Sequence, residues 1–145
     1  MITEDAINVG INVDNAEEAI KAIGALMVNS GLVEEAYTQG MLNVFREFGP
    51  YWVLTEGLAM PHARPEDGAL KSGFALIVLD TPISFGHEEH DPVSLIFGMS
   101  AVDKDTHVEN IRNLTGALST PNMMDLLREA QTAEQACQLL NSIKE

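Results

Sequence analysis

The sequence predicts an α/β domain in which a mixed sheet of about five strands is flanked by α-helices. Residues 74–79 and 93–99 are continuous apolar runs of strand length, a pattern typical of strands covered on both faces. Amphipathic helical patterns precede and follow this strand-rich middle. The 145 residues suit one core, and we see no repeat or linker. We therefore expect a single domain over residues 1–145.

Two helices are expected before the strands. Apolar residues recur at helical spacing from Asp14 to Asn29, and Asp14 or Asn15 can cap the start. A second helix is expected from Glu34 to Phe48, and Gly49-Pro50 ends it. The predicted buried stripe of the second helix consists of Tyr37, Met41, Val44, Phe45 and Phe48.

The middle of the chain changes to strand patterns. Short strands are expected at 51–54 and 58–60, followed by the apolar run 74–79. Asp80-Thr81-Pro82 predicts a turn, and 83–85 a brief edge strand. An acidic loop, 86–92, then leads into the second apolar run.

Three helix starts follow. Asp103 to Thr106 supplies helix-start residues, with Thr106 and Glu109 in capping-box spacing. Thr120-Pro121 predicts the start of a short helix, and Thr132 with Gln135 the start of the last one. The predicted apolar stripe of the first of these helices consists of Val108, Ile111, Leu114, Thr115 and Leu118.

Composition limits the classes of partner and compartment. The 22 acidic and 8 basic residues give a formal net charge of −14, which argues against nucleic-acid binding and favours a basic protein partner. One cysteine, Cys137, allows no intrachain disulfide. The chain start lacks a signal-peptide pattern, and we see no membrane-span run. A cytoplasmic location is expected.

His62 is the leading candidate for chemistry. It lies in LTEGLAMPHARP, residues 54–65, between two prolines that favour extended backbone. A lone histidine is most often structural, but His107 lies near a predicted helix start and Arg64 is two residues away. Two imidazoles, a cation and the N–H groups of a helix start suit an anionic group.

Phosphoryl transfer through a histidine fits these residues. The chain contains no P-loop and no glycine-rich nucleotide fingerprint, so the phosphoryl group would arrive on another protein. A neutral imidazole can attack it, while Arg64 and donor groups stabilise the oxygens. No metal or other cofactor would be required.

A metal-dependent hydrolase is an alternative from another class, using His62, His87, His90 and His107. However, His87-Glu88-Glu89-His90 lacks the helical H-E-x-x-H spacing of zinc proteases, so we expect a solvated acidic loop there and no metal. No G-x-S-x-G elbow supports a serine hydrolase.

Three runs carry a family resemblance. GLAMPHARPEDGALKSGFALIVL, FGHEEHDPVSLIFGMSA and DTHVENIRNL occur in this order, between about Leu32 and Leu118. Together they resemble the enzyme IIA domains of the bacterial phosphoenolpyruvate-dependent sugar phosphotransferase system, in the mannitol/fructose class. FGPYWVLTEGLAMPHARPEDG is most similar to the ascorbate-type components.

The resemblance implies a mixed sheet flanked by helices and a phosphohistidine intermediate without a cofactor. His62 would accept the phosphoryl group from phospho-HPr and pass it to a cysteine of enzyme IIB, which serves the membrane component EIIC. His107 matches the second active-site histidine. Arg46 stands at about the position of the arginine that lines the site in mannitol-type domains, and Arg64 is the competing cation. The alternative within this fold is a regulatory relay that acts on a non-transport partner.

Overall fold

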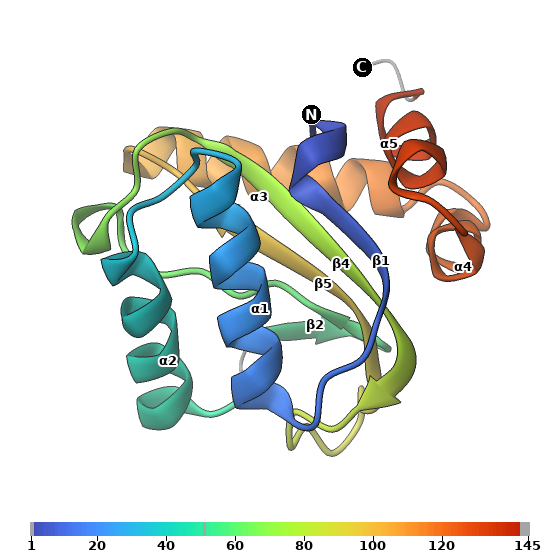
Figure 1. Cartoon of the computed structure of the whole chain (residues 1–145), viewed down its shortest axis with the longest axis horizontal. Helices are drawn as coiled ribbons and strands as arrows, with labels where there is room; N and C mark the ends of the chain where they lie inside the picture. The colour runs from blue at the N-terminus through green and yellow to red at the C-terminus, as the bar shows by residue number, and fades with distance from the viewer. Residues whose placement is uncertain (1, 51, 143–145) are drawn as a thin grey trace.

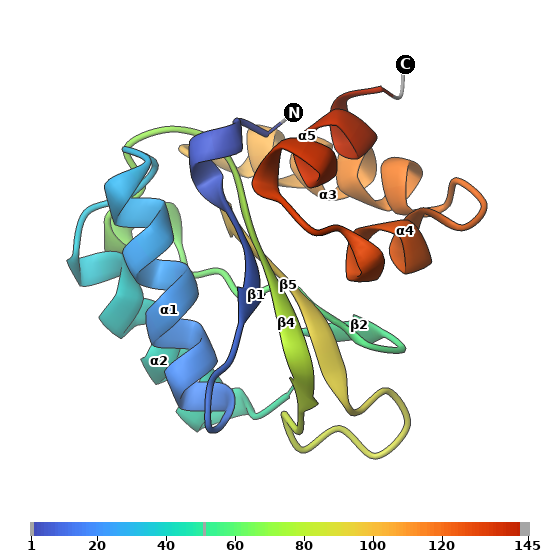
Figure 2. The same ribbon diagram turned by 45° about the vertical axis from the view of Figure 1, so that its right-hand side comes forward.

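A computed structural model describes residues 2–50 and 52–142. In Figures 1 and 2, α1 and α2 lie on one side of a twisted sheet, and α3, α4 and α5 lie on the other side. The order of elements is η1 (Glu4–Ala6), β1 (Ile7–Ile11), α1 (Ala16–Asn29), α2 (Ala36–Phe48), β2 (Val53–Thr55), β3 (Leu58–Ala59), η2 (Pro65–Asp67), β4 (Gly73–Ile83), β5 (Val93–Ser100), α3 (Lys104–Leu118), α4 (Met123–Glu129) and α5 (Ala133–Asn141).

The sheet has the strand order β1-β4-β5-β3-β2 in the described part of the chain. β4 and β5 pair antiparallel, whereas β1 runs parallel to β4 and β3 runs parallel to β5. All eight residues of β5 are buried, as expected of a strand covered on both faces. The predicted α/β class with a mixed five-stranded sheet is confirmed.

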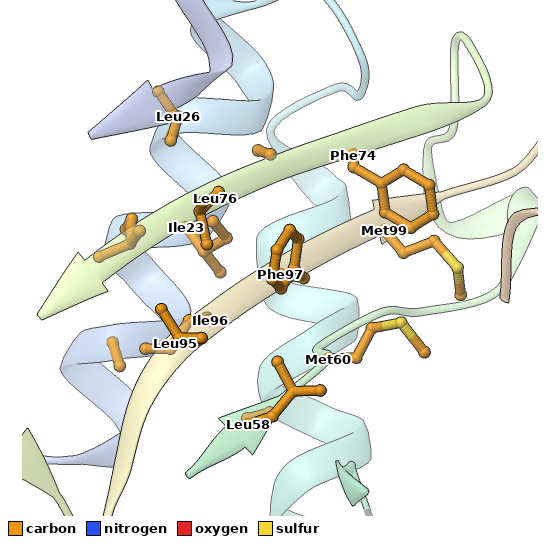
Figure 3. Close-up of a cluster of buried hydrophobic side chains, with 14 of the residues drawn as sticks. Ile23, Leu26, Leu58, Met60, Phe74, Leu76, Leu95, Ile96, Phe97 and Met99 are labelled. Carbon is orange, nitrogen blue, oxygen red and sulfur yellow. The ribbon is translucent and has the colours of Figure 1, made fainter. Parts of the chain in front are cut away.

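The core lies on both faces of β4 and β5. Ile23 and Leu26 of α1 pack from one side, and Figure 3 shows them beside the buried side chains of the central strands. Met60, at the end of β3, is buried beside Met99 of β5 in the same view. The segment that leads to His62 is therefore anchored in the core.

The sheet differs from the predicted strands in two places. β4 continues without a break through the predicted turn Asp80-Thr81-Pro82, since its register with β5 shifts between Val78 and Ile83 and an irregular stretch tolerates proline. β1 was not predicted, although Ile7, Val9 and Ile11 alternate with polar residues or glycine as an edge strand does. Of the predicted strand 51–54, Tyr51 lies outside the described residues.

The predicted helices form, with shifted starts. Asn15 and Thr132 cap α1 and α5 as predicted, but α4 begins at Met123 instead of following Pro121. Three members of the predicted apolar stripes are exposed: Phe48, which is the last residue of α2, and Val108 and Thr115 of α3. Within the described residues, no helix is both long and apolar enough to cross a membrane.

Candidate functional site

His62 lies on an extended segment that follows β3 past its last paired residue. The Met99 amide of β5 donates to the Pro61 carbonyl at 3.0 Å, so the segment continues alongside the end of β5. Pro61 and Ala63 are buried and His62 is half-buried between them. The predicted non-helical presentation of this imidazole is confirmed.

The second histidine, His107, reaches the same place from α3. The centroids of the His62 and His107 rings are 5.1 Å apart, with an angle of 54° between their planes. The Trp52 ring lies 6.0 Å from that of His62. Residues 45 positions apart in sequence thus form one site at the end of β5, as hypothesised from their residue types.

The hydrogen bond of His62 determines its tautomer. Its Nδ1 lies 2.9 Å from the Met60 carbonyl oxygen, and because a carbonyl only accepts, Nδ1 carries the proton. Burial lowers the pKa of His62 below its usual 6.5; the Met60 hydrogen bond opposes this effect, and the charge of His107 adds to it. At neutral pH the ring is therefore uncharged, with the lone pair on Nε2.

His107 is the fourth residue of α3, three positions further into the helix than a cap at Thr106 would place it. Asp103 is the N-cap, and its carboxylate accepts from the Thr106 amide at 2.8 Å and from the Thr106 hydroxyl at 2.7 Å. The His107 amide donates to the Asp103 carbonyl at 3.1 Å. The Asp103 carboxylate therefore already binds the Thr106 amide at this helix start, and α3 contributes the His107 ring beside His62.

The two candidate arginines make ion pairs elsewhere. Arg46, on α2, binds Glu17 of α1 through Nε at 3.2 Å and Nη2 at 2.8 Å. The Arg64 side chain, 73% exposed, pairs with Glu66 at 3.3 Å and Asp67 at 3.6 Å. A role of either guanidinium in binding phosphate would require it to exchange a carboxylate for the phosphoryl group, and it remains a prediction.

His87 and His90 form a separate pair in the loop between β4 and β5. Their rings stack with centroids 4.5 Å apart and 18° between planes. The loop precedes Val93, the first residue of β5, whereas His62 lies beside Met99, about 20 Å along the strand at 3.3 Å per residue. The four histidines named for a metal-dependent hydrolase are therefore not brought together, and residues 2–50 and 52–142 contain no His/Cys/Asp/Glu group placed to hold a metal ion.

Sequence reasoning did not find two partners of the site. Tyr37 was predicted only as a buried helix residue, yet its hydroxyl accepts from the Ala63 amide at 2.9 Å, next to His62. Trp52 belonged to a predicted strand without any role. A buried tyrosine hydroxyl needs a hydrogen-bond partner, which was the available signal, but the pattern did not show which partner it would have.

Curated relatives share most of this chain. An ascorbate-specific PTS system EIIA component from Salmonella typhimurium is 40% identical over 126 residues, which cover 86% of this chain and 82% of the relative. Its namesake from Escherichia coli K12 is 39% identical over the same shares. The similarity therefore extends over most of this chain and most of each relative.

Solved structures with the same fold include mannitol enzymes IIA of Escherichia coli. The mannitol-specific cryptic enzyme IIA superposes with a TM-score of 0.86 at 32% identity, covering 97% of this chain and 95% of the other. Enzyme IIA in a complex with phosphorylated enzyme IIB has a TM-score of 0.85 at 29% identity, covering 99% of each chain. The family model "Phosphoenolpyruvate-dependent sugar phosphotransferase system, EIIA 2" matches residues 1–143. The chain belongs to this enzyme IIA family of the sugar phosphotransferase system.

Proposed function

We propose that this chain is a phosphocarrier in which Nε2 of His62 receives a phosphoryl group from one protein and passes it to another. The observation that supports this most strongly is the tautomer of His62. Its Nδ1–H is held by Met60, so the Nε2 lone pair can form a bond to phosphorus while the ring is neutral.

In the first step, the Nε2 lone pair of His62 attacks phosphorus on the donor's phosphohistidine. A new N–P bond forms as the donor's N–P bond breaks, and that electron pair stays on the donor nitrogen. His62 keeps its Nδ1 proton, so its ring becomes formally cationic beside a dianionic phosphoryl group. The Met60 carbonyl, 2.9 Å from Nδ1, then accepts a stronger, charge-assisted hydrogen bond.

In the second step, a cysteine thiolate of the acceptor attacks the same phosphorus. An S–P bond forms, the N–P bond breaks, and Nε2 regains its lone pair. The reaction needs no cofactor, because the group is already activated when it reaches His62. His62 finishes with the same proton on Nδ1 that it had at the start.

His107 is placed to stabilise the phosphorylated state. With ring centroids 5.1 Å apart, its N–H can reach an oxygen of a phosphoryl group on His62 Nε2. Arg64 and Arg46 are the further candidates for contacting the phosphoryl group, and each would have to leave a carboxylate partner to do so. We therefore assign the larger contribution to His107.

The relatives indicate the partners. Two that are 40% and 39% identical are ascorbate-specific components, and the mannitol enzyme IIA binds phosphorylated enzyme IIB. For this chain we expect phospho-HPr as the donor, a cysteine of an ascorbate-type enzyme IIB as the acceptor, and EIIC as the membrane component served indirectly. These transport relatives favour a carrier over a regulatory relay.

The test is incubation with phosphoenolpyruvate, enzyme I and HPr, followed by intact-protein mass spectrometry. The wild-type chain should gain one acid-labile phosphoryl group, and addition of the cognate enzyme IIB should remove it. His62→Ala should gain none. His90→Ala is the matched control, because it deletes an imidazole of the loop pair, and it should be phosphorylated like the wild type.

Two results would refute the proposal. One is a phosphoryl group on His62→Ala in the same yield as on the wild type. The other is a phosphorylated wild-type chain that no enzyme IIB with a reactive cysteine can dephosphorylate.

A further inference from the structure

The hydroxyl of Tyr37 lies between the His62 segment and the end of β5. It is on α2, and the Tyr37 side chain is 1% exposed. The hydroxyl accepts from the Ala63 amide at 2.9 Å and donates to the Met99 carbonyl at 2.7 Å. The Ala63 carbonyl lies 3.2 Å away as a second, weaker acceptor. One side-chain oxygen thus joins the residue after His62 to the last part of the central strand.

This hydroxyl occupies the place of a backbone hydrogen bond. β3 pairs parallel with β5 through Leu58 and Ala59, and the bond from the Met99 amide to the Pro61 carbonyl continues that ladder beyond β3. In a parallel ladder, residue 63 would next donate its amide to the Met99 carbonyl. Here both groups bind the Tyr37 hydroxyl instead. The two strands therefore separate by the width of one hydroxyl, immediately after His62.

The packing of α2 keeps the hydroxyl in this position. Gly40, one turn further along α2, approaches the same segment so closely that an added Cβ would lie 3.3 Å from that of Ala63 and 3.0 Å from that of Asp67. The Glu34 amide, just before α2, donates to the Gly68 carbonyl at 2.8 Å. The helix thus contacts the segment 63–68 on both sides of Tyr37. The hydroxyl therefore stays between Ala63 and Met99 as long as α2 keeps its position.

We propose that Tyr37 is a positioning residue for phosphoryl transfer. Its hydroxyl holds the backbone of Ala63 away from β5, and this sets the direction in which the His62 ring projects toward His107. The bond from Nδ1 to the Met60 carbonyl depends on that direction. The inference rests on His62 being the phosphoryl acceptor, but it concerns a residue that does not touch the reacting atoms.

Without the hydroxyl, the ladder can close. In Tyr37→Phe, the Ala63 amide and the Met99 carbonyl both lose their partner, and the strands can move together to bond directly. Such a shift would move His62 relative to His107 by a fraction of the strand spacing. Misplacement of a reacting group by about 1 Å costs up to roughly a hundredfold in rate, so we expect transfer from phospho-HPr to slow by about tenfold to a hundredfold.

Ser100→Ala is the matched control. Ser100 is also buried, is next to Met99 on β5, and its hydroxyl donates to a backbone carbonyl, that of Lys71, at 2.7 Å. The substitution removes a comparable hydrogen bond without touching residues 60–63. We expect it to lower thermal stability about as much as Tyr37→Phe while leaving the transfer rate as in the wild type.

A spectroscopic readout separates positioning from stability. In ¹⁵N spectra of the His62 ring, wild type and Ser100→Ala should show a protonated Nδ1 and an unprotonated Nε2, whereas Tyr37→Phe should show a mixture of tautomers. Unchanged His62 tautomer and unchanged transfer rate in folded Tyr37→Phe would overturn the proposal, as would equal slowing in both variants.

The wild-type chain provides a test that does not depend on a variant folding. The Tyr37 hydroxyl proton should give a nuclear Overhauser effect to the Ala63 amide proton. A coupling across a hydrogen bond from the Ala63 nitrogen to the Met99 carbonyl carbon would show a closed ladder and refute the inference. Loss of His62 phosphorylation in the wild type would instead refute the proposed function, so the two failures are distinguishable.

Discussion

The chain contains two histidine pairs with similar ring spacing and opposite hydrogen bonding. The His62 and His107 rings are 5.1 Å apart, and the His87 and His90 rings 4.5 Å apart. In the first pair, His62 Nδ1 donates to a carbonyl. In the second, His87 Nδ1 accepts from the backbone amides of Glu89 at 3.2 Å and His90 at 3.1 Å. Proximity of two imidazoles is thus not enough to define a reactive site.

The difference lies in which nitrogen keeps its lone pair. His87 uses the Nδ1 lone pair to close a turn, so when neutral it carries its proton on Nε2. His62 has the reverse tautomer, with the lone pair on Nε2, and its Nδ1–H is bound. A nucleophile or metal ligand needs a lone pair on the outer nitrogen. His62 provides one on Nε2, whereas neutral His87 does not, so the partner of Nδ1 decides which ring nitrogen can react.

The largest expected effect is on the pair at the end of β5. His107→Ala should slow phosphoryl transfer by about a hundredfold, because it removes a donor that stabilises charge on the phosphoryl oxygens. Folding should change little, since His107 is only half-buried. Rapid-quench measurement of transfer from phospho-HPr checks this. His90→Ala is the control, and equal rates for the two variants would contradict the role of His107.

The next effect concerns Asp91, which organises the loop of the second pair. Its carboxylate accepts from the amides of Phe85 at 3.0 Å, Gly86 at 2.8 Å and His87 at 2.9 Å, and from the Ser84 hydroxyl at 2.7 Å. Burial alone would raise the pKa of Asp91, but these hydrogen bonds outweigh it and lower the pKa. Its ionised form is therefore stabilised.

In Asp91→Asn, an amide NH₂ faces at least one backbone N–H whichever way it turns. We expect the free energy of unfolding to fall by about 2 kcal/mol. Urea unfolding measures the loss, and the transfer rate through His62 should remain that of the wild type. A large loss of transfer without a loss of stability would show that the loop belongs to the functional site.

A smaller effect is expected from His87→Ala. The substitution removes the acceptor of the Glu89 and His90 amides, which can then bind water because the loop is at the surface. We therefore expect the free energy of unfolding to fall by about 1 kcal/mol. Hydrogen exchange at these two amides should become faster, and exchange at Phe85 should change less because Asp91 still binds its amide. Unaltered exchange at residues 89 and 90 would refute the turn-closing role of His87.

The smallest effect is a pH dependence from His62. Burial lowers the pKa of His62 below 6.5, so in the pH range just below 6.5 the unfolded chain binds a proton that the folded chain does not. The free energy of unfolding should therefore fall as the pH falls from 6.5 to the folded-state pKa. At a pH below that pKa the transfer rate should also fall, because the protonated ring has no lone pair on Nε2. An NMR titration of the His62 ring measures the midpoint. A midpoint above 6.5 would contradict this account.

Sequence patterns predicted the periodic parts of the fold and the composition of the site. The apolar runs in β4 and β5 and the caps at Asn15 and Thr132 are local signals, and they were confirmed. The path of β4 through Pro82 was not predicted, because it depends on which residues lie opposite in β5. Local composition cannot report a register shift.

The geometry of the site depended on contacts between residues distant in sequence. Residue types pointed to His62 and His107, but their meeting needs α3 to pack at the end of β5. The Met60 carbonyl that sets the His62 tautomer and the Tyr37 hydroxyl beside Ala63 are invisible to periodicity. Arg46 and Arg64 were chosen by charge and spacing, and both bind carboxylates in the structure. Charge alone did not show these pairings.

The most direct test of the central claim is a long-range ¹H–¹⁵N spectrum of the histidine rings before and after phosphorylation. Before phosphorylation, we predict a proton on Nδ1 and a lone pair on Nε2 for His62, and the reverse for neutral His87. Afterwards, the His62 Nε2 signal should show coupling to phosphorus while Nδ1 stays protonated. A phosphoryl group on Nδ1 of His62, or on any ring other than His62, would contradict the account.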